Sequence, residues 1–291
     1  MNTRPSLNQE ASRSDQPARA AAIEFTRSLA AAWVAELGTP LLGVYLLGSL
    51  AHGGLSRRYS DIDLAFIAED APSSVAFEDM QAHAAARSPE LASKLSLFWT
   101  DRRFSVGRFP LLDRIDYLDH EKPLAERVRV RPARPSPKQI RSYLHGAPFE
   151  NWRRAAQRFE CLDRLPANER KAYLRVLLYP ARFAFSWITG RVASNDDAVD
   201  FVCERRPLGL DTDLIGRALQ CRLSDSDPDP LFEARTVLPQ QVEACERIET
   251  NEQAIALSDW DPTAANYLIA CGLIGEPVAP VITSGGPQKK N

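Results

Sequence analysis

The chain has 291 residues, of which 44% are hydrophobic, enough for an ordinary buried core. This length exceeds the usual ~100–200 residues of one domain and favours two domains. A net charge of −2 gives no overall basic excess and argues against a nucleic-acid partner, while a local basic patch stays compatible with one.

The sequence favours a cytoplasmic protein with no membrane partner. The N-terminal residues are polar and lack the apolar run of a signal peptide. No stretch approaches the ~20 apolar residues that a membrane helix needs. Five cysteines lie far apart without a CxxC pair, so we expect reduced thiols rather than zinc ligands. They are Cys161, Cys203, Cys221, Cys245 and Cys271.

The first half of the chain predicts a mixture of helices and strands. Residues 1–17 are small and polar, and we expect them to be disordered. Apolar residues at spacing four predict a helix over Ala18–Leu37, which Gly38 and Pro40 end. A second helix is expected at Ser74–Arg87. Short apolar runs predict strands at Leu41–Leu47, Asp61–Ile67, Leu95–Thr100 and Arg114–Leu118.

A proline-rich stretch at residues 127–138, RVRVRPARPSPK, separates this half from a helical one. We therefore predict a first domain over residues 18–131, a linker over 132–138 and a helical domain over 139–282. The polar tail 283–291 is expected to be disordered. The predicted helices of the second half are Lys171–Thr189, Asp196–Arg206, Asp211–Leu223 and Leu231–Glu249.

The segment LLGSLAHGGLSRRYSDIDLAF, residues 46–66, carries the candidate chemistry. Gly48 lacks a Cβ atom and can approach a phosphate closely, and Ser49 can begin a short helix whose free N–H groups suit phosphate. Asp61 and Asp63, at spacing two on a strand, share one face. Two such carboxylates can hold a pair of Mg²⁺ ions. Gly-Ser alone is usually a turn and a lone DxD is usually solvated, but the combined pattern is specific.

A third carboxylate usually completes such a site, where it binds the second metal or accepts a proton. Asp116 lies between Ile115 and Tyr117 on a predicted strand, and we choose it for this role. Asp113 is the alternative, and Asp101 lies at the far end of its strand. An ordinary exposed acid at position 116 is the competing interpretation.

The four histidines show neither HExxH nor a paired metal-ligand spacing. They are His52, His83, His120 and His145. Of these, His52 lies inside the Gly-Ser segment, where it could touch phosphate, although a solvent-facing position is more typical for such a residue.

The Gly-Ser and Asp-x-Asp pattern resembles the signature of the DNA polymerase β-like nucleotidyltransferase superfamily. By that resemblance, Gly48 and Ser49 would hold the NTP phosphates, and Asp61 and Asp63 would bind metal. The segment 181–207 resembles the C-terminal helical domain of streptomycin/spectinomycin adenylyltransferases, with Ala181-Arg182-Phe183 and Thr189-Gly190-Arg191. Asn195 replaces a lysine of that family, and its drug-binding acids have no clear counterpart.

The sequence thus predicts an α+β protein, with an N-terminal nucleotidyltransferase domain of mixed β-sheet and flanking helices, and a C-terminal all-α bundle that binds the acceptor. The expected reaction moves a nucleoside monophosphate, with AMP from ATP as the favoured case, from an NTP to a hydroxyl of a small-molecule acceptor, with two Mg²⁺ ions as cofactors. An aminoglycoside-like compound is one candidate acceptor. The alternatives are a non-catalytic nucleotide-binding or toxin-neutralising protein, and a nucleotidyltransferase acting on protein or RNA.

Overall fold

The computed structural model describes residues 16–38, 40–71, 74–207 and 209–249, and the side chains of residues 74–77 are not described. The segments 1–15 and 250–291 lie outside these ranges, as do most of the positions expected to be disordered. Two of those positions are helical instead, because helix α2 spans Gln16–Leu37 and begins two residues before the predicted start.

The N-terminal half is built on a five-stranded mixed sheet within the described residues, in the order β4-β3-β2-β1-β5. Strand β1 is antiparallel to β2 and β5, β2 is parallel to β3, and β4 is antiparallel to β3. The predicted mixed sheet is confirmed. The strands are β1 (Leu41–Leu47), β2 (Ile62–Ala68), β3 (Leu95–Asp101), β4 (Gly107–Arg108) and β5 (Lys122–Glu126).

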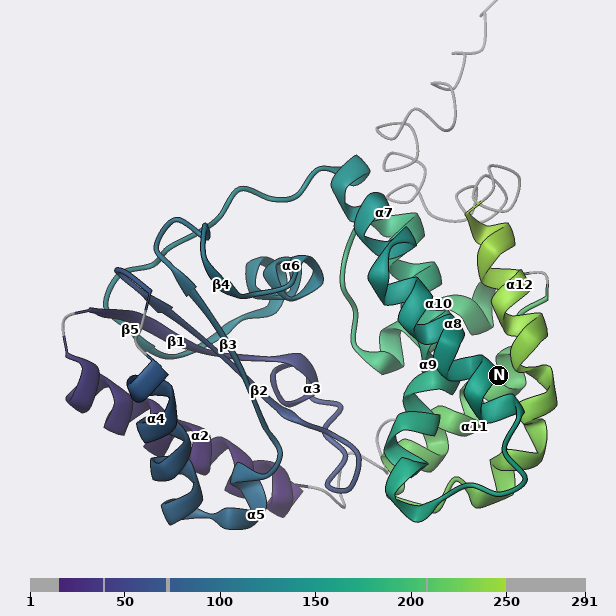
Figure 1. The fold of residues 1–291 in the computed structure, drawn as a ribbon, viewed down its shortest axis with the longest axis horizontal. Helices are drawn as coiled ribbons and strands as arrows, with labels where there is room; N and C mark the ends of the chain where they lie inside the picture. The colour runs from purple at the N-terminus through teal and green to yellow at the C-terminus, as the bar shows by residue number, and fades with distance from the viewer. Residues whose placement is uncertain (1–15, 39, 72–73, 208, 250–291) are drawn as a thin grey trace, which may run out of the picture.

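Helices cover both faces of this sheet (Figure 1). Helices α2, α4 (Ser74–Arg87) and α5 (Pro89–Ala92) lie on one face, over a core that contains Trp33 and Phe66. Helix α6 (Leu111–His120) lies on the other face, over a second core that contains Tyr45 and Tyr117. Cover on both sides explains why every residue of β1 is buried.

The predicted strand at Arg114–Leu118 is wrong, since these residues belong to α6. Successive residues of a helix turn by about 100°, so Ile115 and Tyr117 point into different cores. Ile115 joins the core of the helical half, and Tyr117 joins the core beneath the sheet. Helix α6 therefore packs between the sheet and the helical bundle and contributes a side chain to the core of each.

The C-terminal half is a helical bundle around α9 (Arg170–Thr189). The single helix predicted over Leu231–Glu249 is wrong: a 3₁₀ helix covers Asp229–Val237, and α12 begins only at Leu238. No helix in the described part is long and apolar enough to cross a lipid bilayer. The remaining helices are α7 (Pro137–His145), α8 (Ala147–Glu160), α10 (Asn195–Arg205) and α11 (Thr212–Leu223), with a 3₁₀ turn at Ala167–Glu169.

The long connection between the halves, residues 127–136, has no regular secondary structure and leads from β5 to α7 (Figure 1). Helix α7 begins at Pro137, where Ser136 and Gln139 form a capping box. Two residues of the predicted linker 132–138 are thus helical. The domain limits 18–131 and 139–282 remain predictions.

A second contact between the halves is made by residues 55–60. Tyr59 is part of the helical core, and its hydroxyl donates to the backbone oxygen of Ser226 at 2.6 Å. The buried Arg222 guanidinium of α11 donates to the backbone oxygen of Tyr59 at 3.2 Å and to Oγ of Ser60 at 2.8 Å. This loop therefore fixes the start of β2 against the bundle.

Replacing Arg222 should loosen that contact. Arg222→Met leaves the buried Tyr59 carbonyl and Ser60 hydroxyl without this donor, so we expect a loss of about 2–4 kcal/mol in the free energy of unfolding. Arg217→Met, an exposed position on the same helix, should change it by less than ~0.5 kcal/mol. Urea denaturation measures both, and equal stabilities would contradict the assignment.

Gly48, the first residue of helix α3 (Gly48–His52), offers a second test. Its φ is +62°, almost that of Gly38 at +60°, so alanine costs about 1–2 kcal/mol of backbone strain at either position. A Cβ atom on Gly48 would also collide with the Asp63 carboxylate, whereas one on Gly38 meets nothing within 4 Å. We expect Gly48→Ala to lower the melting temperature clearly more than Gly38→Ala. A difference in the opposite direction would show that the close approach is absent.

Candidate active site

A cleft separates the sheet half from the helical half, and charged side chains line both walls. One wall carries carboxylates from β2, its preceding loop and α6, and the other carries guanidinium groups from α9 and α11. The cleft is lined by all five residues that the sequence assigns to the site, which are Gly48, Ser49, Asp61, Asp63 and Asp116. The lining includes Gly48, Ser49, Asp61, Asp63, Asp113, Asp116, Arg175, Arg182, Asn195 and Arg222.

The Gly-Ser turn forms the end of the cleft where β1 passes into α3. The backbone N–H of Gly48 donates to Oδ2 of Asp116 at 2.9 Å. Oδ1 of the same carboxylate accepts a hydrogen bond from Nε2 of His52 at 2.7 Å. The amide that the sequence assigns to phosphate thus has a carboxylate partner, which holds the turn against α6.

The two carboxylates of the Asp-x-Asp pattern have different surroundings. Asp61 precedes β2 by one residue and is paired with Lys171 and Arg175 of α9. Asp63 is the second residue of β2, and burial, followed by the charges of Asp61 and Asp113, raises its pKa to about 7. An ionised Asp63 is therefore short of positive charge, a condition that a bound divalent cation would relieve.

The two acids of α6 are perturbed in opposite directions. Burial raises the pKa of Asp113 to about 6, although Arg182 opposes this shift. Burial acts on Asp116 too, but the hydrogen bonds from His52 and Gly48 outweigh it and hold the Asp116 pKa below its usual value. Asp116 is thus held ionised by the protein itself, while Asp113 titrates closer to neutrality.

The carboxylates are spread along the cleft rather than gathered around one point. In the described residues, the group of three possible ligand atoms within 4.8 Å of one another is His52, Asp116 and His120, and it contains neither Asp61 nor Asp63. Mg²⁺ takes oxygen ligands, so the donor chemistry of Asp61 and Asp63 fits it. A wider spread suits two ions ~3.5–4 Å apart better than one.

The basic wall was not recognised in the sequence as part of the site. Lys171, Arg175 and Arg182 follow one another at spacings of four and seven, which places them on one stripe of α9. That spacing was the available signal. The two arginines of the segment 46–66, Arg57 and Arg58, pair with Glu90 and Asp227, and neither lines the cleft.

No protein-family model matches the sequence, and no curated protein matches it. The structure is similar to that of the spectinomycin adenyltransferase AAD(9) from Enterococcus faecialis, solved with ATP and spectinomycin. The TM-score is 0.54 at 15% sequence identity, and the match covers 74% of this chain and 94% of that one.

A toxin–antitoxin structure with AMP-PNP gives a TM-score of only 0.27 at 23% identity, over 34% of this chain and 73% of that one. This value is too low to bear on the fold. The similarity to AAD(9) is sufficient for that purpose, so the chain shares the fold of that structure, with a helical C-terminal half.

Proposed function

We propose that this chain transfers AMP from ATP to a hydroxyl group of a small-molecule acceptor, in a magnesium-dependent reaction. The observation that carries the proposal is the cleft in which Asp61 and Asp63 face Arg175 and Arg182. The carboxylates can bind metal ions, and the guanidinium groups can bind the oxygens of the triphosphate that the metal ions neutralise. The structural neighbour AAD(9), whose structure holds ATP and spectinomycin, supports the same assignment.

The proposed reaction is an in-line displacement at the α-phosphorus. The acceptor oxygen forms a bond to phosphorus, the bond to the bridging oxygen breaks, and pyrophosphate leaves. Arg175 and Arg182 bind phosphate oxygens, and Gly48 and Ser49 form the end of the cleft where the triphosphate lies. Mg²⁺ held by Asp61 and Asp63 would neutralise the developing charge on these oxygens. The residues of the chain chiefly position the reactants.

A carboxylate of α6 accepts the proton of the acceptor hydroxyl in this proposal. The sequence favours Asp116, and that assignment stays a prediction. The geometry favours Asp113, because both oxygens of Asp116 already accept hydrogen bonds. Asp113 also acts more strongly than Asp116 on the pKa of Asp63. A base with a pKa near 6 is ionised at neutral pH and still accepts a proton.

A side cavity next to the cleft is the candidate acceptor pocket. It shares Leu112, Asp113 and Arg182 with the cleft, so an acceptor seated there would place a hydroxyl beside Asp113. Its walls are mainly aromatic and apolar, and they suit a ring-bearing acceptor of low charge better than a polycation. The further lining residues include Tyr143, Leu144, Tyr179 and Phe183.

Incubation with α-labelled ATP and Mg²⁺ tests the proposal directly. The acceptor panel should contain neutral aromatic alcohols, aminoglycosides, total RNA and a mixed protein extract. Label on a small molecule supports the proposal. Label on RNA or protein would show that the acceptor is a macromolecule and not a small molecule. Binding of ATP without any transfer would identify a nucleotide-binding regulator instead.

Asp63→Asn should abolish transfer and also stabilise the metal-free protein. Losing a metal-binding charge should lower the rate by at least ~10²-fold. The Asp63 pKa of about 7 exceeds the ~4 of an unfolded chain, so the free energy of unfolding of the metal-free protein falls as pH rises from about 4 to 7. The asparagine variant lacks this loss and should melt higher at pH 8.

The control for this measurement is Asp213→Asn, an exposed acid on α11. It should leave both the transfer rate and the pH dependence of melting unchanged. Normal turnover by Asp63→Asn would remove Asp63 from the metal site. An unchanged melting profile would show that the carboxylate is compensated in the folded protein.

The two acids of α6 are separated by a pair of variants. Asp113→Asn should lower kcat by at least ~10²-fold while Mg-ATP still binds, because it removes the base and not the metal ligands. Asp116→Asn should have the smaller effect on kcat. Single-turnover rates and nucleotide-induced thermal shifts measure both properties. The reverse order would return the role to Asp116.

A further inference from the structure

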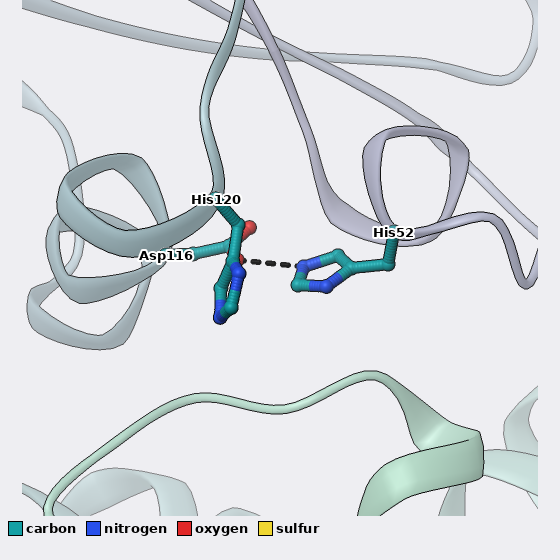
Figure 2. Close-up of side chains that lie close together, drawn as sticks. All are labelled: His52, Asp116 and His120. Atoms are coloured by element: carbon teal, nitrogen blue, oxygen red, sulfur yellow. Dashed lines mark hydrogen bonds and ion pairs between the residues drawn. The ribbon is translucent and has the colours of Figure 1, made fainter.

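We propose that His52, Asp116 and His120 form a binding site for a divalent transition-metal ion, at the junction of α3 and α6. This site is separate from the Asp61 and Asp63 carboxylates and does not rest on the proposed transfer reaction. Figure 2 shows the three side chains converging from the two helices, with the His52–Asp116 hydrogen bond between them.

The distances are close to those of a bound ion. Nε2 of His52 lies 2.7 Å from Oδ1 of Asp116, and the two imidazole centroids are 4.5 Å apart. One ligand atom from each of the three residues lies within 4.8 Å of the others. Ligands at ~2.0–2.1 Å from a tetrahedral ion are about 3.4 Å apart, so a modest rotation of His120 closes the set.

The local structure prearranges these ligands. Asp116 and His120 are four residues apart on α6, which places them one above the other on the same face. His52 is the last residue of α3, and its side chain and that of Asp116 are each only 8% exposed. Burial excludes much of the water that would otherwise compete for these donors.

Second contacts orient two of the three ligands. Nε2 of His120 lies 3.0 Å from the backbone oxygen of Val192, which leaves Nδ1 for an ion. Metal-binding histidines typically donate their other N–H group to such a carbonyl. The other oxygen of the Asp116 carboxylate, Oδ2, accepts a hydrogen bond from the backbone N–H of Gly48. The hydrogen-bonding pattern therefore matches that of a metal ligand set.

The donor types select the ion. Two imidazoles and one carboxylate suit zinc, cobalt or iron, whereas Mg²⁺ prefers oxygen donors alone. His52 and Asp116 line the cleft between the two halves, so the fourth position opens toward this cleft. A water molecule or an oxygen of a bound phosphate can complete the coordination. On binding, the ion takes the place of the His52–Asp116 hydrogen bond: the imidazole offers Nε2 as a lone-pair donor and carries its proton on Nδ1.

Cobalt provides a spectroscopic test with the full chain, freed of metal beforehand. Titration with Co²⁺ should give one equivalent of bound ion with visible d–d absorption. Stoichiometric Zn²⁺ should remove this absorption, and a large excess of Mg²⁺ should leave it. His120→Ala should weaken binding at least ~10-fold. His145→Ala, an exposed histidine paired with Glu249, is the matched control and should bind normally.

Two further measurements make the result decisive. Asp63→Asn should keep the cobalt spectrum, because Asp63 is not a ligand of this site. Circular dichroism establishes that each variant is folded. Absence of bound cobalt in the folded protein, or equal affinity in His120→Ala, would overturn the proposal. Loss of binding in Asp63→Asn but not in His120→Ala would place the ion on the Asp-x-Asp carboxylates and would overturn it too.

Discussion

The cleft depends on the contact between Arg222 and the loop that precedes β2. The guanidinium group binds the Tyr59 carbonyl and the Ser60 hydroxyl, and Tyr59 itself is buried in the helical core. Asp61 and Asp63 follow directly in the chain, so this anchor sets how far they stand from α9. The long connection 127–136 has no regular structure. The two walls of the cleft are therefore joined by the contacts of this loop and by the ion pairs of Asp61 with Lys171 and Arg175.

The same anchor concentrates charge of each sign on opposite walls. Burial, followed by the charges of Arg182 and Arg175, lowers the pKa of Arg222 to about 10. The pKa of Asp63 is raised for the corresponding reasons, which are burial and the charges of nearby acids. Clusters of acids and of bases whose like charges disfavour the ionised forms of their members are typical of sites that bind charged ligands. A triphosphate would bring negative charge to the arginines, and its metal ions would bring positive charge to the carboxylates. A salt bridge with a purely structural role would not leave such unmet charge on either wall.

The parts of the fold that local sequence determines were predictable. The apolar runs gave β1 and β2, and the Gly-Ser and Asp-x-Asp pattern placed its residues in the cleft. The strand over Arg114–Leu118 was an error of window length: Ile115-Asp116-Tyr117 alternates like a strand, but Leu111, Ile115 and Leu118 repeat like a helix. The meeting of His52 with His120 depends on α6 packing against α3, so no local spacing could reveal it.

The register of the sheet explains why further acids beside Asp63 come from α6 and not from β3. Strand β3 runs parallel beside β2, and its residue opposite Asp63 is Ser96, so the neighbouring strand offers no carboxylate at that level. The acid of β3, Asp101, pairs at the other end of the strand with Ala68. It is occupied there by Ser105 and the Val106 amide, which hold its pKa at about 2. Besides Asp61, the acids that act on Asp63 are Asp113 and Asp116 of α6, which packs over this face of the sheet. A helix there presents two acids at once: Asp116 is bound to the Gly-Ser turn, and Asp113 lines the side cavity.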